Sequence, residues 1–184
     1  KNSMIFEEQK LQGVYVIAPK LHIDKRGYFF ESFRQKEFYD MLGCNFVQDN
    51  HVYTKKINTI RGLHYQVKNP QGKLIQVISG AIYDLVVDIR IGSKDFGKTF
   101  KVELSSSNHK MLYVPSGFAH GYLVLAKNTI VAYKCTNYFA PNDEYGISWN
   151  DPDLNISWGV ADPVISDKDK NLPSLKNQKI LPKI

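Results

Sequence analysis

Short runs of β-branched and aromatic residues, each bounded by glycine, proline or polar residues, constrain the fold of this chain more than any other feature. The runs lie at residues 14–19, 27–33, 74–79, 82–89, 99–104, 110–114, 121–124 and 129–136. Runs of this length and spacing are typical of strands in an antiparallel sandwich or barrel. We therefore predict an all-β jelly roll, in which residues 74–79 and 82–89 pair as a hairpin around Gly80.

Helical signals are few. Residues 35–42 predict one helix, which ends at Gly43. The segment after Trp158 is rich in Asp, Pro and Lys, so we expect short helical turns on the barrel surface and then a mobile tail at residues 170–184.

A length of 184 residues with 43% hydrophobic residues suits one well-buried core and is too short for two typical domains. We therefore expect a single domain over residues 1–184. Lys1, Asn2 and Ser3, which precede Met4, are interpreted as a possible added remnant and are left out of the fold prediction.

Composition also limits the partners and the location. No run approaches the roughly 20 apolar residues of a membrane span, and the N-terminus has no apolar signal core. Cys44 and Cys135 have no motif spacing, which favours free thiols in a reducing cytoplasm. The net charge of +6 is spread along the chain and forms no basic helix or RNA-binding aromatic motif. We therefore expect no nucleic-acid or membrane partner. The scattered lysines either form a solvated surface or contribute to a local basic pocket for a small polyanion such as a nucleotide diphosphate.

The segment Arg61-Gly62-Leu63-His64-Tyr65-Gln66, followed closely by Lys73, carries the strongest chemical signal. An imidazole titrates near neutral pH, so His64 is a candidate general base. If Lys73 points into the same cavity, its ammonium can stabilise an oxyanion on a substrate carbonyl. The alternatives are a structural histidine and a lysine at the edge of a strand.

Two further residues can complete such a site. Tyr133 lies in a β-branched run, where a phenol can donate a proton from the face opposite the base; the alternative is a core aromatic residue with a hydrogen-bonded hydroxyl. Asp169 can orient His64 through the second ring nitrogen, and the alternative is a solvated loop charge.

A metal site is disfavoured. β-barrel enzymes that hold a metal often use a His-X-His pair, but the second residue after His64 is Gln66. The later segment Pro115–His120 contributes one imidazole, whereas three or four ligands are needed.

Eight segments along nearly the whole chain have a distinctive sequence: residues 24–33, 46–51, 61–66, 71–74, 87–90, 115–121, 133–134 and 149–152. Together they resemble the dTDP-4-dehydrorhamnose 3,5-epimerase family. Each is weak alone, and their combination in this order is specific.

The resemblance implies a cupin-type double-stranded β-helix with a few short peripheral helices, and a homodimer that exchanges N-terminal strands. It implies epimerisation at C3 and C5 of dTDP-4-keto-6-deoxy-D-glucose, giving dTDP-4-keto-L-rhamnose, without a metal or redox cofactor. The alternatives are a relative that inverts C3 or C5 alone on another nucleotide-linked 4-keto sugar, a non-catalytic carbohydrate-binding jelly roll, and a metal-dependent cupin enzyme.

The resemblance also implies roles for individual residues. His64 matches the general base, Asp169 its partner, Lys73 the group that holds the enolate oxygen, and Tyr133 the acid. The positions that match substrate contacts are Arg26, Glu31, Gln48, Asp49, Asn50, Arg61, His120, Phe139, Glu144 and Lys168. Phe139 stands where the family often has a tyrosine that stacks on thymine; a phenyl ring can still stack there.

Overall fold

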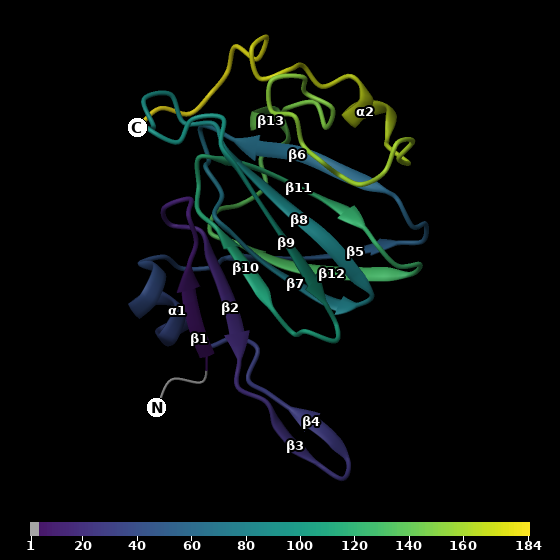
Figure 1. Ribbon diagram of the computed structural model, residues 1–184. Helices are drawn as coiled ribbons and strands as arrows, with labels where there is room; N and C mark the ends of the chain where they lie inside the picture. The colour runs from purple at the N-terminus through teal and green to yellow at the C-terminus, as the bar shows by residue number, and fades with distance from the viewer. Residues whose placement is uncertain (1–3) are drawn as a thin grey trace.

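The computed structural model describes residues 4–184 as two antiparallel sheets that face each other, with a small hairpin projecting from one end (Figure 1). The six-stranded sheet has the order β1-β2-β10-β7-β12-β5, and the five-stranded sheet has the order β13-β6-β11-β8-β9. The all-β prediction is therefore confirmed.

The strands of the six-stranded sheet are β1 (Met4–Glu8), β2 (Tyr15–Pro19), β5 (Gln48–Thr54), β7 (Lys73–Ser79), β10 (Met111–Val114) and β12 (Thr129–Cys135). Those of the five-stranded sheet are β6 (Ile60–Gln66), β8 (Ala81–Asp88), β9 (Thr99–Ser105), β11 (Phe118–Val124) and β13 (Glu144–Gly146). The projecting hairpin consists of β3 (His22–Asp24) and β4 (Gly27–Phe29). The helices are α1 (Gln35–Leu42), the 3-10 helix η1 (Pro141–Asp143) and α2 (Asp167–Lys170).

The main core lies between the two sheets. Ile75 and Val77 of β7 pack there against Val86 of β8 and Phe118 of β11. The outer face of the six-stranded sheet is covered by α1, whose Phe38 is fully buried. Strands that bury residues on both faces are rich in apolar residues, which is why β7 and β8 were easy to predict.

The predicted hairpin between residues 74–79 and 82–89 is wrong. β7 pairs with β10 and β12, whereas β8 pairs with β9 and β11, so the two runs belong to different sheets. Gly80, with φ of 85°, turns the chain from one sheet to the other, and a Cβ there would lie 2.2 Å from the Thr129 Oγ1 atom. Both strands are rich in buried apolar residues, and such a pattern does not identify the strands beside them.

Other strands differ from the prediction in extent. The run at 27–33 forms a strand only over Gly27–Phe29, after which Phe30 and Phe33 pack on the outer cluster with Phe38. The edge strand β5 was not predicted, because its exposed positions are polar and it lacks a β-branched run. The helix prediction at residues 35–42 is confirmed, and Gly43 ends the helix with φ of 69°.

The C-terminal segment covers one end of the five-stranded sheet and includes the predicted short helical turn, α2 (Figure 1). Residues 180 and 182 of the predicted tail are hydrogen bonded to the body of the protein. The Tyr65 hydroxyl donates to the Ile180 carbonyl at 2.6 Å, and the Ile91 N–H donates to the Pro182 carbonyl at 2.8 Å. No helix among residues 4–184 is long and apolar enough to cross a membrane.

Candidate active site

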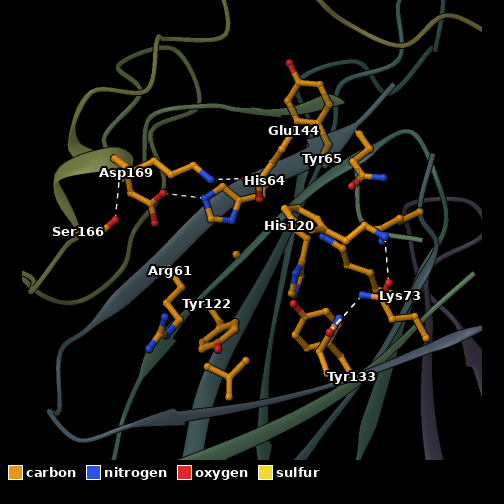
Figure 2. A pocket seen from close by; sticks show the side chains of 18 residues that line it. Arg61, His64, Tyr65, Lys73, His120, Tyr122, Tyr133, Glu144, Ser166 and Asp169 are labelled. Carbon is orange, nitrogen blue, oxygen red and sulfur yellow. Dashed lines mark hydrogen bonds and ion pairs between the residues drawn. The ribbon is translucent and has the colours of Figure 1, made fainter. Parts of the chain in front are cut away.

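A cavity of roughly 460 Å³ lies between the two sheets and takes side chains from both walls and from the segment around α2 (Figure 2). Its lining residues are Gln48, Asn50, Val52, Arg61, His64, Tyr65, Gln66, Gln71, Lys73, His120, Gly121, Tyr122, Tyr133, Phe139, Glu144, Ser166, Lys168 and Asp169. Most residues that the sequence predicted for the site therefore meet in one place.

His64 and Asp169 form a hydrogen-bonded pair at one wall. The distance between His64 Nε2 and Asp169 Oδ1 is 2.7 Å, and the second carboxylate oxygen accepts the Gly62 N–H at 3.0 Å. The Ser166 hydroxyl caps α2 by accepting the Asp169 N–H at 3.2 Å, which fixes the acid on its short helix. With Nε2 facing the carboxylate as a donor, Nδ1 carries the lone pair that a general base needs.

The Asp169 carboxylate is buried, yet it remains the charged form. Burial alone would raise its pKa, but the hydrogen bonds from His64 and Gly62 and the nearby Lys168 outweigh burial and lower the pKa below the ordinary value. An ionised Asp169 holds the imidazole in one orientation and stabilises the imidazolium that forms when His64 takes a proton.

Gly62 and Gly121 lie near the two histidines, where β6 and β11 are too close together to leave room for a side chain. Gly62 has φ of 111°, and a Cβ there would lie 2.7 Å from the His120 carbonyl oxygen. A Cβ on Gly121 would lie 2.6 Å from the Arg61 carbonyl oxygen. β6 and β11 therefore approach closely, and their register shifts between His120 and Tyr122.

A second imidazole–carboxylate pair, which the sequence prediction missed, lies on the same wall. His120 Nε2 is 2.6 Å from Asp84 Oδ1, and Asp84 is fully buried in β8. The available signal was an acidic residue within the apolar run at 82–87, because such a residue is costly to bury unless it is paired.

Lys73 and Tyr133 come from the opposite wall, the six-stranded sheet, where they lie on β7 and β12. The Lys73 ammonium has no hydrogen-bond or ion-pair partner among residues 4–184, and burial lowers its pKa. Burial raises the pKa of Tyr133, so its phenol stays protonated near neutral pH.

The remaining predicted contacts surround these groups. Gln48 donates to Asn50 at 3.1 Å and accepts the Phe139 N–H at 2.9 Å, while the Phe139 ring is about half exposed. Arg61 donates through Nε to the Thr54 hydroxyl at 3.1 Å. Lys168 of α2 and Glu144 of β13 form an ion pair.

Three predicted contact residues lie outside this cavity. Arg26 projects on the β3–β4 hairpin and pairs with Asp24 at 2.6 Å. Glu31 pairs with Arg34 at 2.7 Å. Asp49 pairs with Lys134 at 2.9 Å and lines a separate cavity of roughly 270 Å³.

Neither a metal cluster nor a disulfide is present in the part of the chain that the structure describes. Residues 4–184 contain no group of three or more His, Cys, Asp and Glu residues placed to hold a metal ion. Cys44 and Cys135 are both unpaired.

The family model for dTDP-4-dehydrorhamnose 3,5-epimerase matches residues 8–177 of the chain. A dTDP-4-dehydrorhamnose 3,5-epimerase from Methanothermobacter thermautotrophicus is 41% identical over 179 residues, which cover 95% of this chain and 96% of that protein. The chain belongs to the dTDP-4-dehydrorhamnose 3,5-epimerase family. It is a nucleotide-sugar 3,5-epimerase, an isomerase of dTDP-rhamnose biosynthesis.

Solved structures confirm the cupin jelly roll of this epimerase family. The dTDP-6-deoxy-D-glucose-3,5-epimerase of Legionella pneumophila, in complex with dTDP-4-keto-L-rhamnose, is 39% identical with a TM-score of 0.94, and the match covers 98% of each chain. A 3'-monoepimerase of Streptomyces bikiniensis in complex with dTDP-quinovose is 31% identical with a TM-score of 0.90, and the match covers 96% of this chain and 92% of that one.

Proposed function

We propose that this epimerase binds dTDP-4-keto-6-deoxy-D-glucose between its two sheets and inverts C3 and C5 with a base on one sheet and an acid on the other. The observation that carries the proposal is the position of the groups: His64 with Asp169 on the five-stranded wall, and Tyr133 on the six-stranded wall. Removal of a proton from one face and its return to the other face is what changes the configuration of a carbon.

The reaction needs two proton transfers at each carbon. C3 and C5 both adjoin the C4 ketone, so the loss of either proton gives an enolate whose charge lies largely on the ketone oxygen. His64 takes the proton through Nδ1, and the C–H electron pair enters the enolate. Tyr133 then donates its hydroxyl proton to the opposite face of the same carbon, and exchange with solvent restores both side chains.

Lys73 is the group that we assign to the enolate oxygen. Its ammonium has no protein partner among residues 4–184 and faces the same cavity as His64. A fixed cation beside the oxygen stabilises the charge as it develops, and removal of one such donor typically costs roughly 10²–10³ in turnover. The acidity comes from the substrate ketone, so the proposed chemistry uses no redox cofactor or metal.

The nucleotide is assigned to the rim of the cavity. Arg61 and Lys168 supply positive charge for the diphosphate, and the half-exposed Phe139 ring is available to stack on the base. His120, Asn50, Gln48 and Glu144 complete the predicted contacts. The Legionella epimerase complex with dTDP-4-keto-L-rhamnose supports a ligand of this class.

We also propose a homodimer in which the β3–β4 hairpin reaches a second copy. The hairpin extends away from the sandwich (Figure 1), and it exposes Ile23 by 79% and Phe29 by 68%. Apolar side chains on a projecting element favour burial in an interface. Arg26 and Glu31 would then contact the nucleotide bound by the partner, which accounts for their distance from the cavity of their own chain.

The single domain over residues 1–184 and the cytoplasmic location belong to the same proposal. The two unpaired thiols, Cys44 and Cys135, support a reducing compartment.

Incubation with dTDP-4-keto-6-deoxyglucose in D₂O, without added metal or cofactor, tests this function. Mass spectrometry and NMR should find deuterium at both C3 and C5, together with the L-rhamno product. Deuterium at one carbon alone would identify a monoepimerase, and no deuterium would contradict the proposal. A His64→Asn protein is the matched control and should incorporate deuterium far more slowly.

A further inference from the structure

Two buried side-chain atoms have no hydrogen-bond partner among residues 4–184: the hydroxyl of Tyr122 and the Oδ2 atom of Asp84. Buried polar groups in folded proteins are nearly always paired, because an unpaired one is destabilising. A phenylalanine at position 122 would fill the same space without this cost. The Tyr122 hydroxyl therefore needs an explanation beyond packing.

Tyr122 belongs to the wall of the active-site cavity. It lies opposite Asp84 of β8 and opposite Arg61 of β6, and residues opposite one another in antiparallel strands project to the same face. Figure 2 shows Tyr122 beside Arg61 on the side of the cavity toward Tyr133. The ring centroid of His120 is 6.2 Å from that of Tyr122.

Another tyrosine of the cavity has a different arrangement. Tyr65 also lies along the cavity, but its hydroxyl is satisfied by the Ile180 carbonyl at 2.6 Å. Burial raises the pKa of Tyr122, with the nearby Arg61 opposing this and Tyr133 and Asp84 adding to it. The Tyr122 hydroxyl thus stays protonated and remains available as a donor.

We propose that Tyr122 is a further substrate-binding residue, whose hydroxyl donates a hydrogen bond to an oxygen of the hexose. The proposal rests on the proposed function, because the substrate is the nucleotide-linked sugar. The hexose is favoured over the nucleotide base because Tyr122 is next to His120 and close to Tyr133, the proposed acid on the opposite wall, whereas Phe139 is the group available to the nucleotide base. The half-exposed Phe139 and the almost fully buried Tyr122 thus serve different parts of the ligand.

The test compares ligands with and without the sugar. Calorimetric titration with dTDP and with dTDP-glucose, which has no ketone and is not turned over, gives both affinities for the unmodified protein and for Tyr122→Phe. The variant should bind dTDP-glucose about three- to tenfold more weakly, as expected for one neutral hydrogen bond, and should bind dTDP equally well. Its melting temperature without ligand should be unchanged or higher, because an unpaired buried hydroxyl has been removed.

Tyr65→Phe is the matched control. It also removes one hydroxyl at the cavity, but a satisfied one, so its melting temperature should fall while the ratio of the two affinities stays constant. An unchanged ratio in Tyr122→Phe would overturn the proposal, and a lower melting temperature with that unchanged ratio would make the hydroxyl structural.

Deuterium incorporation by the unmodified protein separates the two hypotheses. Incorporation together with an unchanged affinity ratio rejects only the assignment of Tyr122. A lack of incorporation rejects the proposed function, whatever the ratio is.

Discussion

His64 and His120 lie directly opposite each other on β6 and β11, and each imidazole is hydrogen bonded to a different aspartate. Their surroundings differ, since the His64 side chain is 26% exposed and the His120 side chain is 8% exposed. Only His64 is open enough to meet a substrate proton while its partner stays fixed. The asymmetry supports His64 as the base, and it leaves His120 as a fixed group of the wall that contacts the substrate without taking its proton.

Replacement of His64 should therefore mainly lower kcat, whereas replacement of His120 should mainly lower the free energy of unfolding. His64→Asn should lower kcat by roughly 10²–10⁴ with little loss of stability, because a general base is removed from a half-open position. His120→Asn should lower the free energy of unfolding by about 3 kcal/mol, because it leaves the buried Asp84 without its partner. Steady-state kinetics and denaturant unfolding of both variants measure this contrast, and equal losses of kcat at normal stability would argue against it.

The Lys73 assignment predicts an alkaline limit to activity. Lys73 must be protonated to stabilise the enolate oxygen. Burial lowers the pKa of Lys73 from its ordinary value of 10.5, so activity should fall as the pH rises, and the fall should begin before pH 10.5 is reached. Lys73→Met should lower kcat by roughly 10²–10³ and remove the alkaline limb from the residual activity. Lys36→Met, which removes an exposed ammonium from α1, should leave the pH profile as it is. A Lys73→Met protein that keeps the alkaline limb would assign that limb to another group.

Tyr133→Phe should separate proton exchange from inversion. His64 can still remove and return a proton on its own face, so deuterium should still enter the substrate, while formation of the inverted product should slow by roughly 10²-fold. NMR of the same reaction in D₂O measures both quantities. The control is Tyr113→Phe, which alters a buried phenol on the opposite face of the same sheet. Equal slowing of exchange and inversion would mean that Tyr133 is not the acid.

Mixed dimers can test the proposed role of Arg26. Arg26→Ala and His64→Asn chains should each form weakly active homodimers. A heterodimer of the two would contain one intact site, with His64 from one copy and Arg26 from the other, and should regain about half of the normal activity. Two affinity tags allow the heterodimer to be purified for assay. Activity no higher than the mean of the two homodimers would indicate that Arg26 does not act across the interface.

The sequence predicted strands well where buried apolar residues dominate, and less well elsewhere. The run at 74–79 is mostly apolar because Ile75 and Val77 pack in the main core and Leu74 packs in the outer cluster with Phe38 of α1. β5 at the sheet edge has polar exposed positions, so its strand character depends on pairing with β12, which a local pattern does not contain. The pairing of β7 and β8 was mispredicted for the same reason.

The site was predicted unevenly as well. His64 and Lys73 stood out because their own segment places charge between apolar runs, whereas Asp169 was a candidate that alone could equally have been a solvated loop charge, and the resemblance to the family favoured it. A contact between residues 64 and 169 depends on how the C-terminal segment folds back over β6. Asp84 was not predicted because its partner, His120, lies on another strand, and the local sequence around Asp84 does not reveal that contact.

The turn at Gly80 has a consequence for how the protein is made. The chain changes sheets between β7 and β8, so the strand that carries Lys73 can pair only after β10 and β12 have been made. His64 likewise gains its hydrogen-bond partner only when Asp169, near the end of the chain, has been made. Pairings between distant segments form slowly compared with local ones. On the ribosome, the proposed base and its oxyanion partner would emerge early, and the active site would be among the last parts of the protein to assemble.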